Sequence, residues 1–313
     1  MVNDLKIVFM GTPEFGATIL LKMINSDISP FLVVTNPDKP AGRGKKIQQS
    51  IVANVASKSN INVFKPQTMT ELEDKMKEVN PDLIVIASYG KIISKNILDI
   101  PKYKTINVHP SLLPQYRGPA PIQYAILNND KKTGVTIMLV EEEMDSGDIL
   151  KQEEVALKNK TTYQELSSEL ALIGGDLLVK TIPNWVSGKI QPKKQGPFPT
   201  YTKILNRFDG RIDWKDPAEK IERQIRAFNP WPGAYAYQKD KIIKVLDADV
   251  LEQTRNGPFG TPGKVYLGSN ETIVVQTGKD FLVIKEFQLE GKKAMKTEEY
   301  LRGNNNLIGV VLK

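Results

Sequence analysis

The sequence has no cysteine and a single histidine, His109, among its 313 residues. Without cysteine the chain can form no disulfide, no iron–sulfur cluster and no thiolate zinc site, which fits a reducing compartment. With one histidine, any metal site would have to be built from carboxylates, and the spacing of an EF-hand loop is absent. We therefore expect no metal ion in the chemistry of this protein.

Long apolar runs are also missing. The run at residues 7–10 is too short for the core of a signal peptide and ends in Gly-Thr-Pro-Glu, and no run is long enough to cross a bilayer. The chain is 40% hydrophobic and 25% charged, as soluble globular proteins are, and its length leaves room for two domains. We expect a cytoplasmic protein with no membrane partner.

The charge is unbalanced, with a formal net charge of +7. A basic surplus favours a polyanionic partner such as nucleic acid, or an acidic substrate. Lysine-rich coding in an AT-rich genome would give the same surplus, so charge alone leaves both interpretations open.

Strand-like and helix-like segments alternate through the first half of the chain. Apolar runs predict strands at residues 5–10, 31–35, 62–64, 83–87, 105–108 and 135–140, and helical patterns fall at 71–79, 122–127 and 162–186. The alternation predicts an α/β fold with a mostly parallel sheet and helices on both faces. Because ligands of such folds bind at the carboxyl ends of the strands, the loops after residues 10, 87, 108 and 140 are expected to form the site.

The pattern changes near residue 190. A stretch rich in proline, glycine and lysine predicts a linker at 190–207, between a first domain at 1–189 and a second at 208–313. The second domain has short alternating apolar runs separated by turn residues, which predicts a small β-barrel.

The first loop, GTPEFG, follows a strand and precedes a helix. It lacks the G-x-G-x-x-G spacing of a dinucleotide site and the Gly-Lys-Ser/Thr of a P-loop. The simplest interpretation is a tight turn in an α/β core.

Asn107 and His109 end an apolar strand and, by strand alternation, share one face. A lone buried histidine is more often structural than catalytic. An amide donor beside an imidazole at a strand's carboxyl end is, however, suited to stabilising a developing oxyanion. Asp145, a few residues after the strand at 135–140, could reach the same pocket and relay protons. A serine triad with Ser111 is disfavoured, because the G-x-S-x-G elbow is absent.

The loop at residues 36–46 is glycine-rich and carries Arg43, Lys45 and Lys46. It is either an ordinary solvated loop or an arm that contacts phosphates, since such side chains release counterions when they bind a nucleic acid.

Seven segments occur in one order along nearly the whole chain: FMGTPEFG, TNPDKPAGRGKK, IASYGKI, INVHPSLLPQYRGPAPIQYAI, TGVTIM, MDSGDI and IRAFNPWPGAY. Together they resemble the methionyl-tRNA formyltransferases. The set Asn-x-His, Ser-Leu-Leu-Pro and Asp-x-Gly-Asp is similar to that of the folate-dependent formyltransferase superfamily. Within that superfamily, PAGRGKK narrows the resemblance to the methionyl-tRNA formyltransferases. Ser88 and Pro110 depart from the usual pattern without removing a functional group.

The resemblance implies a Rossmann-like domain without a dinucleotide fingerprint, followed by an OB-like β-barrel. It implies formyl transfer from 10-formyltetrahydrofolate to the α-amine of methionyl-initiator tRNA, by a monomer in the bacterial cytoplasm. Asn107 and His109 would stabilise the oxyanion, and Asp145 would orient the imidazole and relay protons. The resemblance also implies folate contacts by Ser111, Leu112, Leu113, Pro114, Ser88, Tyr89 and Gly90. It implies tRNA contacts by Arg43, Lys45, Lys46 and the second domain.

Other enzymes of the same superfamily are the alternatives. A sugar-nucleotide formyltransferase, a glycinamide ribonucleotide formyltransferase or a formyltetrahydrofolate hydrolase would share the Asn-His-Asp set, but the basic loop favours tRNA. A non-catalytic RNA-binding protein would explain the charge and the barrel, and would leave Asn107, His109 and Asp145 without a role.

Overall fold

The computed structural model describes residues 4–41, 46–252, 260–269 and 271–313. Within these residues no helix combines the length and the apolar composition that crossing a membrane requires. The chain separates into two compact units, described in turn. The first comprises Met1–Pro121, Lys132–Leu157 and Glu165–Lys203, and the second comprises Ile122–Lys131, Lys158–Gln164 and Ile204–Lys313.

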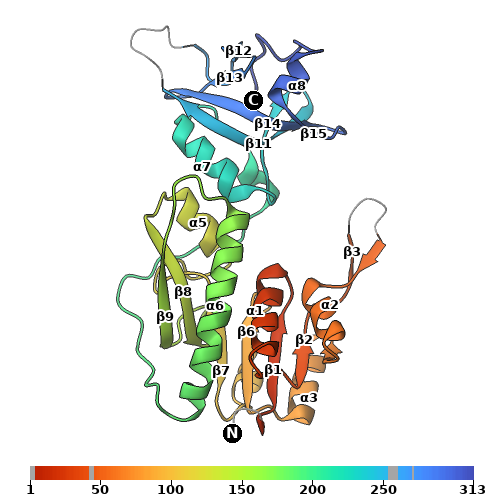
Figure 1. The fold of residues 1–313 in the computed structure, drawn as a ribbon, viewed down its shortest axis with the longest axis vertical. Coiled ribbons are helices and arrows are strands. Elements are labelled where there is room, and N and C mark those ends of the chain that lie inside the picture. The colour runs from red at the N-terminus through yellow and green to blue at the C-terminus, as the bar shows by residue number, and fades with distance from the viewer. Residues whose placement is uncertain (1–3, 42–45, 253–259, 270) are drawn as a thin grey trace. The chain divides into compact units, whose positions relative to one another are not determined.

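A seven-stranded sheet in the order β5-β2-β1-β6-β7-β8-β9 organises the first unit (Figure 1). Neighbours from β5 to β7 pair in parallel, whereas β8 pairs antiparallel with β7 and β9 antiparallel with β8. The central strands are fully buried apolar runs, as strands covered on both faces usually are. The strands are β1 (Ile7–Gly11), β2 (Leu32–Val34), β5 (Asn62–Phe64), β6 (Leu83–Ala87), β7 (Thr105–His109), β8 (Lys132–Leu139) and β9 (Ile149–Ala156).

Helices cover both faces of this sheet. On one face Val8 and Met10 pack in a single core cluster with Leu72 and Met76 of α3. On the other face α6 comes so close that a Cβ on Gly174 would lie 2.9 Å from a methyl group of Val108. Figure 1 shows α6 and α1 running roughly along the strands. The helices of this unit are α1 (Glu14–Ile24), α2 (Ile51–Lys58), α3 (Met69–Val79), α4 (Lys95–Leu98) and α6 (Tyr163–Val186), and a hairpin of β3 (Lys39–Ala41) and β4 (Lys46–Gln48) stands apart from the sheet. All but the first residue of α5 (Pro121–Leu127) belongs to the second unit.

The GTPEFG loop is shaped by packing. A Cβ added to Gly11 would lie 2.8 Å from the carbonyl oxygen of Ala87, and one added to Gly16 would lie 2.6 Å from the same atom. Both glycines therefore let α1 and β1 approach β6 closely, which accounts for them without a bound phosphate.

The segment that follows α6 also belongs to the first unit. Residues 190–203 follow α6 and are hydrogen-bonded to other parts of the first unit: Lys193 exchanges two backbone bonds with Ile149 at the start of β9 (2.7 and 2.9 Å), and Thr200 and Thr202 exchange two with Arg117 (2.9 and 2.8 Å). Most of the segment predicted to be a linker is thus attached to the sheet domain, while the exact domain boundaries stay a prediction.

The second unit contains a six-stranded antiparallel sheet in the order β10-β11-β14-β13-β12, with β15 paired to β14. Ile221 and Ile225 of the amphipathic helix α7 are buried in its core with Trp214. The elements are η2 (Arg207–Gly210), α7 (Ala218–Phe228), β10 (Ala234–Gln238), β11 (Lys241–Leu251), β12 (Val265–Leu267), β13 (Ile273–Gln276), β14 (Phe281–Leu289), β15 (Ala294–Lys296) and α8 (Thr297–Leu301).

Residues 309–313 connect the two outer strands of this sheet. Lys313 exchanges two backbone hydrogen bonds with Tyr237 of β10 (2.6 and 2.9 Å), and the amide of Leu312 donates to the carbonyl of Gly263 (2.8 Å), just before β12. The barrel-like arrangement is therefore completed by an irregular segment instead of a direct β10–β12 ladder. The predicted fold class, a Rossmann-like sheet domain followed by a small OB-like β domain, is confirmed, although the strands of the second domain do not themselves close into a barrel.

Candidate active site

Three of the loops expected to form the site leave the sheet at the same edge. Gly11 lies beside Ala87, and Ile86 lies beside Asn107 in the parallel ladders, so β1, β6 and β7 end together. The loops that follow these strands therefore converge, as in other open α/β sheets.

The fourth loop, after residue 140, leaves from the opposite edge of the sheet. The strand β8 runs antiparallel to β7, with Thr136 opposite His109 and Leu139 opposite Ile106. The carboxyl end of β8 therefore points away from the shared edge. The loop nevertheless returns toward His109, because a carboxylate oxygen of Asp145 lies 3.6 Å from His109 Nδ1.

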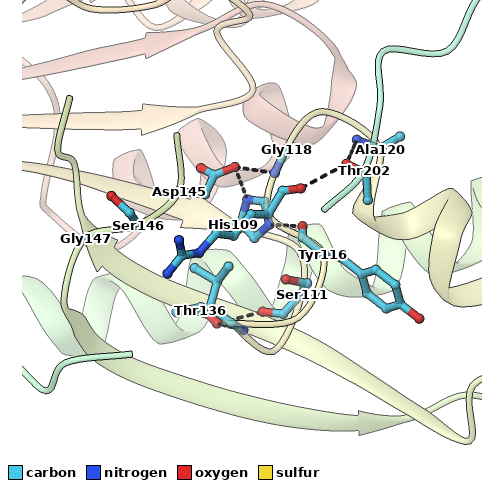
Figure 2. Close-up of polar contacts among 12 residues, drawn as sticks. His109, Ser111, Tyr116, Gly118, Ala120, Thr136, Asp145, Ser146, Gly147 and Thr202 are labelled. Carbon is cyan, nitrogen blue, oxygen red and sulfur yellow. Dashed lines mark hydrogen bonds and ion pairs between the residues drawn. The ribbon is translucent and has the colours of Figure 1, made fainter. Parts of the chain in front are cut away.

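His109 is 4% exposed and has a partner at each ring nitrogen (Figure 2). Its Nε2 atom lies 3.0 Å from the carbonyl oxygen of Tyr116. A carbonyl oxygen can only accept, so this geometry assigns the hydrogen to Nε2. Nδ1 then faces the carboxylate of Asp145, and a second proton on Nδ1 would make this contact an ion pair. The two contacts fix the orientation of the ring.

Asp145 is held in place by the segment beside it in space. The backbone amide of Gly118 donates to Asp145 Oδ2 at 2.7 Å, and the Asp145 side chain is 15% exposed. Its backbone lies in the left-handed region, with φ +51°, a conformation that few residues other than glycine adopt. Figure 2 shows the carboxylate between Gly118 and the imidazole.

Asn107 lies on the same face of β7 as His109, two residues earlier in the strand. Its side chain is half-buried and has no hydrogen-bond partner among the described residues. The amide is therefore available as a donor to a ligand, beside the imidazole of His109.

The loop predicted to contact folate, Ser111–Pro114, is fixed by two side chains that the sequence analysis did not identify. Thr136 Oγ1 donates to the carbonyl of Ser111 (2.6 Å) and accepts from the amide of Leu113 (3.2 Å). Gln152 Nε2 donates to the carbonyl of Leu113 and to Thr136 Oγ1, both at 2.9 Å. In the sequence, the one signal for Thr136 is its position within the TGVTIM motif, and Gln152 has no such signal.

The hydroxyl of Ser111 is occupied elsewhere. It donates to the carbonyl of Gln115 at 2.6 Å, and both nitrogens of His109 face other groups. A Ser111–His109–Asp145 triad is therefore not assembled.

The second segment predicted to contact folate, Ser88 to Gly90, turns sharply after β6. Ser88 and Gly90 are exposed and have positive φ angles of 52° and 76°. The Tyr89 side chain points the other way: it is 1% exposed within the apolar cluster, burial raises its pKa to about 12, and its hydroxyl has no partner among the described residues. Its carbonyl accepts from Asn36 Nδ2 at 3.0 Å. This segment can offer its backbone to a ligand, whereas the Tyr89 ring belongs to the core.

Of the residues predicted to contact tRNA, Arg43 and Lys45 lie outside the described residues, and Lys46 begins β4, where its side chain is not described. In the described part of the chain, no group of three or more His, Cys, Asp or Glu side chains is arranged to hold a metal ion.

Comparison with known proteins gives a consistent result. Residues 5–182 match the formyl transferase family, and residues 205–305 match the formyl transferase C-terminal domain. The chain is 47% identical to the methionyl-tRNA formyltransferase of Clostridium acetobutylicum, covering 99% of this chain and 100% of that one, and 44% identical to that of Clostridium novyi, with the same coverage. In fold it is similar to an N-formyltransferase from Helicobacter canadensis solved with folinic acid and dTDP-3-aminofucose, with TM-score 0.66, 20% identity and coverage of 90% and 98% of the two chains.

Proposed function

The chain belongs to the methionyl-tRNA formyltransferase family, and on that premise we propose that it transfers the formyl group of 10-formyltetrahydrofolate to the α-amino group of methionyl-initiator tRNA. The family is the one that the sequence motifs indicated. The single observation that carries the proposal to this chain is the site at the end of β7: the amide of Asn107, without a partner among the described residues, beside an imidazole whose Nδ1 faces Asp145.

The reaction joins the α-nitrogen of methionine to the formyl carbon and breaks the bond between that carbon and N10 of the folate. Attack by the amine places negative charge on the formyl oxygen. Asn107 and His109 are the donors we assign to that charge, since fixed donors aimed at a developing oxyanion stabilise it strongly. His109 Nε2–H is held by the Tyr116 carbonyl in the free protein, and we propose that the oxyanion takes the place of that carbonyl.

Protons must also move. The α-nitrogen loses one proton and N10 of the folate gains one, so the reaction needs a group that passes protons in both directions. We assign this task to the His109–Asp145 pair. The carboxylate keeps the imidazole oriented, and the Gly118 amide keeps the carboxylate oriented. Such a chain of contacts fixes the geometry before the substrates bind.

The folate contacts are proposed at two segments. Ser88 and Gly90 expose their backbone beside the end of β7, and pockets for small molecules commonly use backbone groups for orientation. The loop Ser111–Pro114, fixed by Thr136 and Gln152, offers an apolar wall. When bound, the folate supplies the activated formyl group. No metal is part of the proposal.

The tRNA is proposed to contact the basic loop through Arg43, Lys45 and Lys46, and also the second domain. The protein would act as a monomer in the bacterial cytoplasm. Replacing Arg43 with alanine should weaken tRNA binding and reduce the slope of log affinity against log salt by about one. An unchanged slope would remove the loop from the tRNA contact.

The proposed activity is tested by offering the purified protein 10-formyltetrahydrofolate with three acceptors in separate reactions: radiolabelled methionyl-initiator tRNA, a dTDP-linked amino sugar, and water alone. We expect formyl-methionyl-tRNA in the first reaction and no product above background in the others. Formylation of the amino sugar, or folate hydrolysis without transfer, would reject the assigned acceptor. No reaction with any acceptor would reject formyl transfer itself.

A further inference from the structure

Gln195 makes four hydrogen bonds with its side-chain amide, all within the first unit. Its Nε2 donates to the carbonyl oxygens of Asp145 (2.7 Å) and Gly147 (2.8 Å). Its Oε1 accepts from Nε (3.0 Å) and Nη2 (2.9 Å) of Arg117. Both hydrogens of the amide nitrogen and both acceptor positions of the oxygen are thus used.

These bonds join the two chain segments that hold the catalytic pair. Arg117 stands between Tyr116, whose carbonyl accepts from His109, and Gly118, whose amide donates to Asp145. The nitrogen of the same Gln195 amide bonds the backbone carbonyl of Asp145 itself. One amide therefore connects the backbone of the carboxylate loop with the segment that bonds both members of the pair.

The conformation of the Asp145 loop needs outside support. Asp145 has a positive φ of 51°, which persists only where the surroundings enforce it. Two side chains of residues 144–147 contribute: Ser146 Oγ donates to the Glu143 carbonyl (2.9 Å), at the start of the loop, and the Asp145 carboxylate accepts from the Gly118 amide (2.7 Å). The two bonds from Gln195 act instead on the carbonyls of Asp145 and Gly147, directly where the carboxylate is set.

Arg117 makes Gln195 hard to replace. The Arg117 side chain is 9% exposed, and its nearest carboxylate oxygen, on Glu143, lies 3.4 Å away. The tyrosine ring of Tyr201 lies 5.9 Å from the guanidinium carbon. The two short bonds to Gln195 Oε1 are the best that this nearly buried cation has, and a buried cation that loses its partners is costly.

We propose that Gln195 is a positioning residue for formyl transfer: it holds Asp145 against His109 by bonding the carboxylate loop to Arg117. The inference rests on the proposed function. Gln195 contacts neither of the reacting groups, and its effect passes through Asp145. Only an amide of this length satisfies both sides, because glutamate has no hydrogens for the carbonyls of Asp145 and Gly147, and methionine has no donor and only a weak acceptor in its sulfur.

The kinetic test compares Gln195→Met and Gln195→Glu with a control, Gln191→Met, which changes the same residue type in the same segment at an exposed position without side-chain bonds among the described residues. Misplacement of a catalytic group by an ångström can cost about 10²-fold. We expect kcat to fall by about 10-fold to 10²-fold in both Gln195 variants, with KM for folate and for tRNA within about twofold of wild type. A rise in KM at unchanged kcat would overturn the inference, since it would make Gln195 a binding residue.

A spectroscopic test does not depend on activity. His109 is the only histidine, so a long-range ¹H–¹⁵N spectrum shows one imidazole. We expect its Nδ1 signal to move in Gln195→Met and in Gln195→Glu, and to stay in place in Gln191→Met. Thermal unfolding shows whether each variant is folded. If Gln195→Met does not fold, Gln195→Glu, which keeps an acceptor for Arg117, decides whether Gln195 positions Asp145 against His109.

The two proposals can fail separately. If wild type formylates methionyl-tRNA while folded Gln195 variants keep full kcat and an unmoved His109 signal, the positioning role is wrong and the proposed function stands. If wild type transfers no formyl group, the proposed function is wrong, and the His109 signal still decides whether Gln195 holds the Asp145–His109 pair.

Discussion

One face of the first unit's sheet is covered in two different ways. Over β1, β2 and β6 the cover is helical and apolar, with Leu72 and Met76 of α3 packed on the strands. Over β7 and β8 the same face carries His109 and Thr136, which are paired across the ladder, and loops cover it. A helix satisfies its own backbone and offers only side chains, whereas a loop brings unpaired backbone groups that need polar partners.

The difference explains where the chemistry lies. The loop-covered half contains carbonyls and amides that must be bonded, and the same bonds orient His109, Asp145 and the Ser111–Pro114 loop. The helix-covered half supplies a rigid base. Changes in the loop-covered half should therefore alter catalysis more than stability, and changes in the helix-covered half should do the reverse.

The largest effect is expected from Asn107→Ala, which removes one proposed oxyanion donor. Loss of such a donor costs about 10²–10³-fold in kcat. The Asn107 amide has no partner among the described residues, so the melting temperature should stay close to that of wild type. Steady-state kinetics and thermal unfolding check both parts, with Asn54→Ala, at an exposed position in α2, as the control. A kcat within about threefold of wild type would remove Asn107 from the mechanism.

The opposite outcome is expected in the helix-covered half. Met76→Ala empties a fully buried position in the apolar cluster and should lower the free energy of unfolding by about 2–5 kcal/mol, with kcat of the folded enzyme unchanged. Asp74→Ala, at an exposed position on the same helix, should change stability by less than about 0.5 kcal/mol. Urea denaturation measures both, and a Met76 variant that loses kcat without losing stability would contradict the division between the two halves.

A smaller effect is expected from Thr136→Val, which keeps the shape but removes the hydroxyl that serves Ser111, Leu113 and Gln152. Leaving buried groups unpaired costs about 1–3 kcal/mol, and a looser loop should raise KM for folate. Thr105→Val is the matched control, because its buried hydroxyl has no partner among the described residues and its removal should be neutral or stabilising. Equal effects of the two substitutions would show that the Thr136 bonds do not hold the loop.

The smallest effect is expected from Tyr89→Phe, since the hydroxyl has no partner in the described residues and kcat should not change. The pH dependence of the free energy of unfolding is more informative. Burial raises the Tyr89 pKa from 10.0 to about 12, so above pH 10 the unfolded chain has lost a proton that the folded chain keeps. The free energy of unfolding then falls as pH rises toward 12. Chemical denaturation can follow this between about pH 9 and pH 11. The free energy of unfolding should fall less steeply with pH for Tyr89→Phe than for wild type. Parallel curves for the two proteins would refute the raised pKa.

Much of the sheet domain could be predicted from the sequence, because its signals are local. The apolar run at residues 83–87 coincides with β6, and the helical pattern at 162–186 differs from α6 by one residue. Such segments are buried on one or both sides, and burial leaves a clear pattern in the residue types. The strand β9 was not predicted, because it lies at the sheet edge, where half of its eight residues are exposed and three are charged, so it has no apolar run.

The site could be predicted only in part, because some of its contacts connect distant segments. Asn107 and His109 are neighbours on one strand, so alternation was enough to place them on one face. The antiparallel direction of β8 leaves no local signal, so the path by which the loop carrying Asp145 reaches His109 could not be predicted. Gln195 lies 50 residues from Asp145 and 78 from Arg117 in a stretch whose composition predicts a linker.

The most direct test of the central claim is the single-turnover rate of formyl transfer to methionyl-initiator tRNA, measured with wild type and His109→Ala at saturating 10-formyltetrahydrofolate. The proposed function predicts transfer by wild type and a loss of about 10²-fold or more in the variant, with tRNA binding retained. Equal rates in the two proteins would contradict the assignment of the chemistry to the only histidine in the chain.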